Sequence, residues 1–214
     1  KHCPVCGGDT EIRQMDEVRS LYCTNPDCQA KKIKSFTLFV SRDALNVDGL
    51  SEATLEKFIG AGFIHEFSDI FHLEQHQEAI VEMEGFGQKS YDNLMASIKK
   101  ASHTTLPRVI YGLGIAGIGL ANAKVLCRKF RFDFDDMRHA SYEELLDIDG
   151  IGDVLAKAWM DYFADGKNNG QVDRLLAELE LKKEEAVSEE EAVFAGKTFV
   201  ITGSVNHFKN RKEL

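Results

Sequence analysis

Four cysteines near the start of the sequence have the spacing of a metal site. Cys3 and Cys6 form a CxxC pair, and sixteen residues later Cys23 and Cys28 form a second pair with a four-residue gap. Paired thiolates at such a separation are typical of tetrahedral zinc sites, where the Zn–S distance is about 2.3 Å. Because four thiolates leave no position for water, the ion would be structural. We predict one structural Zn²⁺ bound by Cys3, Cys6, Cys23 and Cys28.

Two other interpretations of these cysteines stay open, namely two disulfides in a secreted domain and unrelated free thiols. The sequence has no apolar run of 18 or more residues and no basic segment leading into an apolar one. Neither a transmembrane helix nor a signal peptide is therefore expected. A fifth cysteine, Cys127, stands alone among apolar residues, which favours burial over a disulfide framework. We expect a reducing cytoplasmic location and no membrane partner.

A pair of glycines separated by one apolar residue recurs along the chain. The three pairs and one degenerate copy are Gly85/Gly87, Gly117/Gly119, Gly150/Gly152 and Gly49/Ser51. Their leading glycines are 36, 32 and 33 residues apart, a period that is typical of a repeated supersecondary unit. Apolar residues at helical spacing surround the glycine pairs, so each unit is predicted to be a helix, a short hairpin and a second helix.

Such a hairpin has a specific chemistry. Glycine permits a positive φ and removes side chains that would block close approach. The amides that begin the second helix can then bind a phosphate without reading a base. Several hairpins on one domain would hold DNA by its backbone, whereas a single copy could be an ordinary tightly packed helical hairpin. The predicted DNA-binding residues are Gly85, Gly87, Lys89, Gly117, Gly119, Lys124, Gly150 and Gly152.

The net charge of −9 argues against a generally basic nucleic-acid surface, so the charge near each hairpin must decide. Carboxylates surround the first and fourth hairpins, while a lysine follows each of the second and third. The carboxylates are Asp48, Glu52, Asp147, Asp149 and Asp153, the lysines are Lys89 and Lys124, and the second hairpin also has Glu82 and Glu84. We expect the third hairpin to bind phosphate best and the second to follow it.

Other motifs are weaker. Residues 112–117 match the GxGxxG dinucleotide pattern, but the surroundings are helical and no strand is expected before them, so dinucleotide binding is not expected. His72 and His76 lack the HExxH order and are expected to lie on a solvated helix face. Three lysines after the last zinc ligand could contact phosphates or form a solvated face; they are Lys31, Lys32 and Lys34.

In this order, the features resemble the C-terminal half of a bacterial NAD-dependent DNA ligase. Residues 39–50 are similar to the family's stretch between zinc finger and first hairpin. Residues 84–90 resemble its second hairpin, and residues 111–115 resemble the approach to its third. The resemblance covers the whole chain. It implies a parent enzyme that seals nicked double-stranded DNA during replication and repair, with NAD and Mg²⁺ bound outside this segment.

The expected fold class is mainly α, with a small zinc finger before a helical DNA-binding domain. The final apolar stretch, residues 196–203, reads as a strand and resembles the opening of a BRCT domain. The expected units are a four-cysteine zinc finger (1–34), a helix-hairpin-helix domain with hairpins near 49, 85, 117 and 150 (35–180), an acidic linker (181–194) and a truncated first BRCT strand (195–214).

The resemblance also implies what this segment lacks. The family's reaction begins with a lysine in a KxDG motif that becomes adenylated, and no lysine opens the DG motifs at residues 46–49 and 147–150. No catalytic residue is therefore expected here, and the fragment alone is predicted to be inactive. Adenylation and OB-fold domains are expected in cis, in a protein associated with the bacterial nucleoid. The alternative is a stand-alone DNA-repair scaffold that uses zinc and hairpins without ligase activity.

Overall fold

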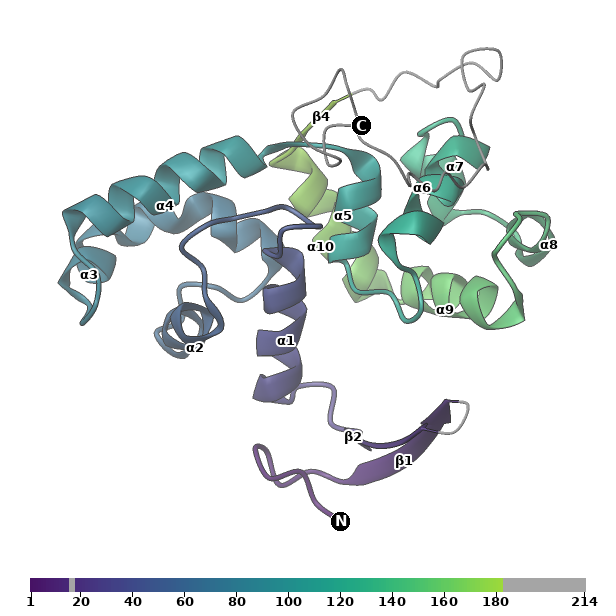
Figure 1. Ribbon diagram of the computed structural model, residues 1–214, viewed down its shortest axis with the longest axis horizontal. Coiled ribbons are helices and arrows are strands. Elements are labelled where there is room, and N and C mark those ends of the chain that lie inside the picture. Colours follow the sequence, from purple (N-terminus) through teal and green to yellow (C-terminus); the bar gives the residue numbers. More distant parts are fainter. Residues whose placement is uncertain (16–17, 183–214) are drawn as a thin grey trace, which may run out of the picture. The chain divides into compact units, whose positions relative to one another are not determined.

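The computed structural model describes residues 1–15 and 18–182, which are mainly helical as predicted (Figure 1). The helices are α1 (Gln29–Phe39), α2 (Glu52–Gly60), the 3₁₀ helix η1 (Phe67–His76), α3 (Gln77–Glu82), α4 (Gln88–Ala101), α5 (Leu106–Gly112), α6 (Leu120–Lys129), α7 (Phe134–Arg138), α8 (Tyr142–Leu146), α9 (Asp153–Ala164) and α10 (Gly166–Ala177). None of the helices in this described part is long and apolar enough to span a bilayer.

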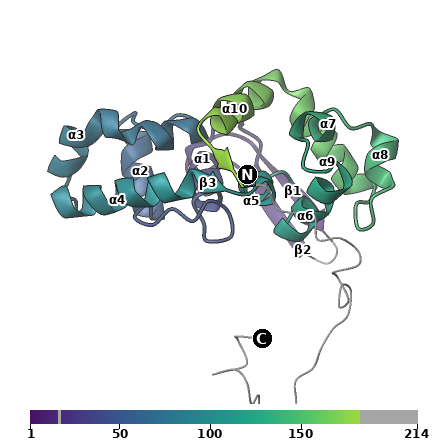
Figure 2. The same ribbon diagram turned by 90° about the horizontal axis from the view of Figure 1, so that it is seen from above.

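Two short sheets accompany these helices. Strands β1 (Thr10–Met15) and β2 (Val18–Cys23) form an antiparallel hairpin in which Thr10 is opposite Cys23. Strands β3 (His103–Thr104) and β4 (Glu180–Leu181) pair in parallel, so the end of the described chain lies beside the α4–α5 connection. Figure 2 shows the two sheets from above. The sequence pattern did not predict the second sheet, because its strands are two residues long and far apart in the chain.

Helix α1 connects the cysteine-rich segment to the helical core. Phe36 and Phe39 on this helix are almost fully buried. Both contact the ring of Phe67 in η1, with centroid distances of 5.1 Å from Phe36 and 4.2 Å from Phe39. The boundary expected between residues 34 and 35 falls inside α1. The domain limits stay predictions. The linker beyond residue 182 and the expected BRCT strand lie outside the described residues.

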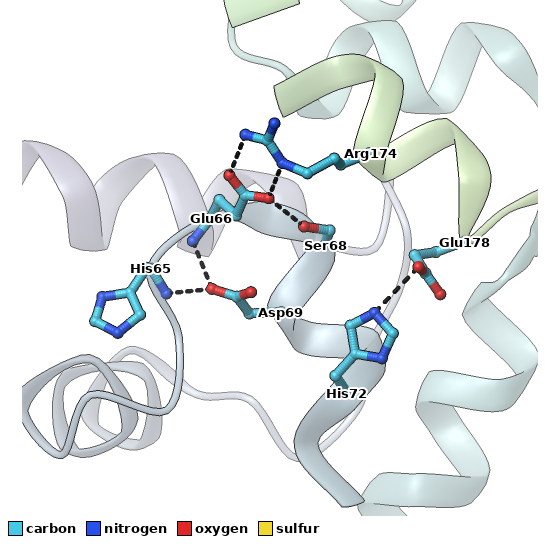
Figure 3. Close-up of polar contacts among 7 residues, drawn as sticks. All are labelled: His65, Glu66, Ser68, Asp69, His72, Arg174 and Glu178. Atoms are coloured by element: carbon cyan, nitrogen blue, oxygen red, sulfur yellow. Dashed lines mark hydrogen bonds and ion pairs between the residues drawn. The ribbon is translucent and has the colours of Figure 1, made fainter. Parts of the chain in front are cut away.

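Helix α10 returns along the chain to contact η1 (Figure 3). Arg174 donates two hydrogen bonds to the carboxylate of Glu66, at 2.5 and 2.6 Å. Ser68 donates a third at 2.6 Å. The Arg174 guanidinium is the largest cause holding the pKa of Glu66 below its ordinary value, so this carboxylate stays charged. This bidentate pair links residues 108 positions apart and thus ties the end of the helical region to its first half.

The two histidines of η1 are partly exposed, and each also makes a contact that the sequence prediction of solvated helix-face residues did not include. His72 Nε2 lies 3.0 Å from a carboxylate oxygen of Glu178. Figure 3 marks this contact with a dashed line. The ring of His76 stacks on Phe63 with a centroid distance of 4.4 Å. Both contacts come from residues far away in the sequence or across a turn, so local spacing could not reveal them.

Candidate functional site

The four predicted zinc ligands lie together. Their sulfur atoms are all within 4.8 Å of one another, with 3.9 Å between Cys3 and Cys28 and 3.5 Å between Cys6 and Cys23. Four sulfurs at about 2.3 Å from a tetrahedral ion would be about 3.8 Å apart. The donor set and its geometry therefore fit a structural zinc ion, and no further donor is needed to complete the shell.

Local backbone geometry brings the sulfurs together. Gly7 has a φ of +68°, and its amide donates to the Cys3 carbonyl oxygen at 2.9 Å. The Cys3 amide donates to the Gly8 carbonyl oxygen at 2.8 Å. This tight turn presents the first two sulfurs to one point. The β1–β2 hairpin returns the chain so that Cys23 follows beside them, and Cys28 is the N-cap residue of α1. The last ligand is thus continuous with the helix that enters the core.

The surroundings of the thiols favour charge on some of them. The amides of Cys6 and Val5 lower the pKa of the Cys3 thiol. The Gly8 amide and the Asn25 side chain lower the pKa of Cys6 to about 6. Burial, assisted by the neighbouring sulfurs, raises the pKa of Cys23 to about 12. A bound zinc ion would supply the positive charge that deprotonates the remaining thiols. Because the four ligands converge only when this segment is folded, metal binding would be coupled to its folding.

The four hairpins share one backbone geometry. Their leading glycines all have positive φ, which is +93° at Gly49, +85° at Gly85, +77° at Gly117 and +83° at Gly150. In the last three copies, the amide of the central apolar residue donates to the carbonyl three positions earlier, at 2.9–3.0 Å. The residue two positions after each leading glycine is the N-cap of the following helix. The sequence period therefore corresponds to a repeated turn, as predicted.

The hairpins differ in what caps that helix. Gly87, Gly119 and Gly152 begin α4, α6 and α9 without any side-chain hydrogen bond to the helix amides. The first amides of a helix have no partner within the helix and attract anions. In the first hairpin, by contrast, the Ser51 hydroxyl accepts from the Thr54 amide at 3.2 Å. Helix α2 thus has a side-chain oxygen at its start, whereas α4, α6 and α9 begin without one.

Charge separates the third and fourth hairpins. The first turns of α4 and α6 contain no acid, whereas α9 begins with Asp153. The Tyr142 hydroxyl and Lys157, at 3.0 Å, hydrogen-bond this carboxylate and hold the pKa of Asp153 low, so it stays ionised. The next residue, Val154, is 76% exposed, at the position that corresponds to the exposed Lys89 of the second hairpin. The fourth hairpin thus presents an acidic and apolar tip.

Neighbouring hairpins also pack against each other. A Cβ atom on Gly49 would lie 3.4 Å from Leu94 of α4, and Ser97 of the same helix accepts from the Asp48 amide at 2.7 Å. A Cβ on Gly117 would lie only 2.5 Å from Leu155 of α9. The first hairpin therefore rests on the second, and the third on the fourth. No local pattern marks Leu94, Ser97 or Leu155 as supporting residues.

The remaining motifs are placed as follows. Gly112 is the last residue of α5, so a helix precedes the GxGxxG pattern in place of the strand that a dinucleotide site requires. Cys127 is fully buried in the helical core, as expected. Lys34 forms an ion pair with Glu52 at 2.9 Å, and Lys31 and Lys32 line an open cleft beside the first turn of α10. One of these three lysines is thus engaged within the fold.

Comparison with known families assigns two parts of the chain. Residues 2–30 match the NAD-dependent DNA ligase C4 zinc finger domain. Residues 108–172, which contain the third and fourth hairpins, match the helix-hairpin-helix motif. These matches agree with the four-cysteine cluster and with the hairpin geometry described above.

Several bacterial proteins are similar to the full chain. It is 54% identical over its whole length to the DNA ligase of Lachnoclostridium phytofermentans and 50% identical to that of Ruminiclostridium cellulolyticum. It is 39% identical, over 97% of its length, to the DNA ligase of Thermosipho africanus. The matched region is 33%, 32% and 31% of these relatives, so the chain spans about a third of their length.

Proposed function

We propose that this chain, which is related over its whole length to bacterial DNA ligases and carries the zinc finger of their NAD-dependent class, is the part of such a ligase that holds duplex DNA by its phosphates. The observation that supports this most directly is the repeated hairpin in which glycine caps the second helix without a side-chain hydrogen bond. Three sets of amides are thereby available to anions. Contacts of this kind are independent of base sequence, as nick sealing requires.

The whole protein is proposed to seal nicks in double-stranded DNA during replication and repair. NAD and Mg²⁺ would be bound by adenylation and OB-fold domains in cis, and this segment would contribute no catalytic group. The proposed location is the cytoplasm, in association with the nucleoid. A stand-alone repair scaffold is not favoured, because relatives that match the full chain are named DNA ligase.

Within this segment, the third hairpin is proposed to bind phosphate most strongly and the second hairpin next. Lys124 lies in the helix after the third hairpin, and no acid occupies the first turn of that helix. Exposed charges are screened over about 8 Å at physiological ionic strength, so acids elsewhere on the chain contribute little at a hairpin. The overall charge of −9 is thereby compatible with local phosphate binding.

The substitution Gly119→Asp tests the proposal. Gly119 has a φ of −80°, and a Cβ atom there would meet no other atom within 4 Å, so aspartate fits without strain. Its carboxylate would cap the α6 amides, as Ser51 caps α2, and would repel a phosphate. We expect about a tenfold loss of affinity for nicked duplex, measured by fluorescence anisotropy, with unchanged or slightly higher thermal stability.

Gly166→Asp is the matched control. It introduces the same charge in open space, in the first turn of α10 and outside the hairpins. Its affinity should stay close to that of the wild type. Equal affinity of Gly119→Asp and Gly166→Asp would contradict phosphate binding at the hairpin amides, and a wild-type chain that binds no duplex would contradict the proposed function as a whole.

A further inference from the structure

The loop of the second hairpin is held by a helix that belongs to the first hairpin. Lys57 of α2 donates from Nζ to the carbonyl oxygen of Glu84 at 2.8 Å. Glu84 immediately precedes Gly85, the residue with positive φ. The next side chain on α2, Phe58, is fully buried, and its ring centroid lies 5.6 Å from that of Phe86, the central residue of the hairpin. Adjacent residues of α2 thus contact both sides of Gly85.

Helix α2 has no open phosphate site of its own. Its N-terminal amide is capped by Ser51, and Glu52 in its first turn pairs with Lys34. Its last turn contains Lys57, which points its ammonium group at the loop of the neighbouring repeat. The first repeat therefore has the fold of the others but makes its contacts with the second hairpin.

Lys57 has two physical effects on that loop. A hydrogen bond between a charged donor and a carbonyl fixes the peptide before Gly85, so less conformational freedom remains to be lost when a ligand binds. Its positive charge also offsets the carbonyl dipole at a place where Glu82 and Glu84 add negative charge. Both effects favour an anion at the amides that follow Gly87.

We infer that Lys57 is a positioning residue for phosphate binding by the second hairpin, acting through the Glu84 carbonyl without touching DNA. This inference rests on the proposed function of the hairpins. The first repeat then supports the second hairpin, and it does so through the side chain of Lys57.

The test compares three variants of the chain. Lys57→Met removes the ammonium group and keeps the apolar stem, and Lys57→Arg keeps a charged donor. Lys129→Met makes the same charge change in the last turn of α6, at the opposite end of that helix from Gly119. Affinity for duplex DNA is measured at several salt concentrations, and amide hydrogen exchange is measured in the free protein at Phe86, whose amide donates to the Met83 carbonyl at 2.9 Å.

We expect Lys57→Met to weaken binding about fivefold, the effect of one lost hydrogen bond, and Lys57→Arg to restore binding to within about twofold. Lys129→Met should bind like the wild type. The salt dependence of Lys57→Met should keep the wild-type slope, because only a side chain that itself neutralises a phosphate changes that slope, by about 0.9 for each phosphate. Exchange of the Phe86 amide should be faster in Lys57→Met than in the wild type.

Three results would overturn the inference. One is equal binding by Lys57→Met and Lys129→Met. Another is a slope lowered by about one unit, which would mean that Lys57 binds a phosphate directly. The third is unchanged exchange of the Phe86 amide, which decides the matter even if the wild-type chain binds no duplex and the proposed function itself fails.

Discussion

The two ends of helix α1 lie in regions that are held together in different ways. At its start, Cys28 belongs to a segment whose large apolar side chains are mostly exposed, including Val5, Ile12 and Leu21. At its end, Phe39 is fully buried in a continuous apolar core that extends through all four hairpins. One region depends on four sulfurs around one ion and the other on packing. The same helix can therefore lose order at one end while it stays fixed at the other.

Removal of the metal should separate the two regions most clearly. Cys23→Ser, or a zinc chelator added to the wild type, should unfold residues 1–28, because so small a segment lacks a core of its own. The helical region should stay folded. Limited proteolysis and metal analysis would detect the change, with circular dichroism at 222 nm as the measure of the helices. Loss of most of the helical signal on chelation would show that the helical region also depends on the metal. Purified protein that contains disulfides and no zinc would show that the cysteine-rich segment does not depend on it.

Gly117→Ala should have the next largest effect, within the packed region. The new methyl group would meet Leu155 at 2.5 Å and would also strain a residue with a φ of +77°. We expect a loss of about 3 kcal/mol in the free energy of unfolding. Gly85→Ala adds only the φ strain, since its Cβ position is open, and should cost about 1–2 kcal/mol. Urea denaturation would compare them, and equal losses would show that Leu155 moves aside.

The third and fourth hairpins should differ in DNA affinity by a smaller amount. Gly119→Asp is expected to lower affinity about tenfold, and Gly152→Asp by about threefold or less, because the ionised Asp153 already weakens phosphate binding there. Both glycines have open Cβ positions and a negative φ, so both variants should fold. A larger loss for Gly152→Asp, in anisotropy measurements on nicked duplex, would reverse the ranking of the hairpins.

The smallest expected effect concerns the link between α10 and η1. Arg174→Met should lower the free energy of unfolding only slightly at pH 7, because the ion pair with Glu66 is partly exposed. Arg174 lowers the folded-state pKa of Glu66, so its stabilisation is complete above the unfolded pKa and is lost as pH falls through the folded one. The difference between Arg174→Met and wild type should therefore vanish in acid. A difference independent of pH would mean that packing, and not charge, provides the link.

The sequence predicts the local features of both regions and few of the long-range ones. Spacing alone identifies the cysteine cluster, and the glycine pairs predict the positive φ values and helix starts, because these depend on residues within one turn. The supporting contacts of Lys57, Ser97, Leu155 and Arg174 join positions 27 to 108 residues apart or belong to other repeats. Ser51 could be interpreted in two ways from the sequence. Within the glycine repeat it is a departure from the pattern, but serine at the start of a helix is also a common N-cap residue.

The cap of the first hairpin also bears on how such repeats can change over generations. Two of the six serine codons differ from glycine codons by a single base, so one point mutation exchanges serine and glycine wherever those codons are used. Because either residue fits the same backbone and helix start, such a mutation would alter the anion site and leave the fold intact. A lineage could thus redistribute DNA contacts among its hairpins without passing through an unfolded intermediate.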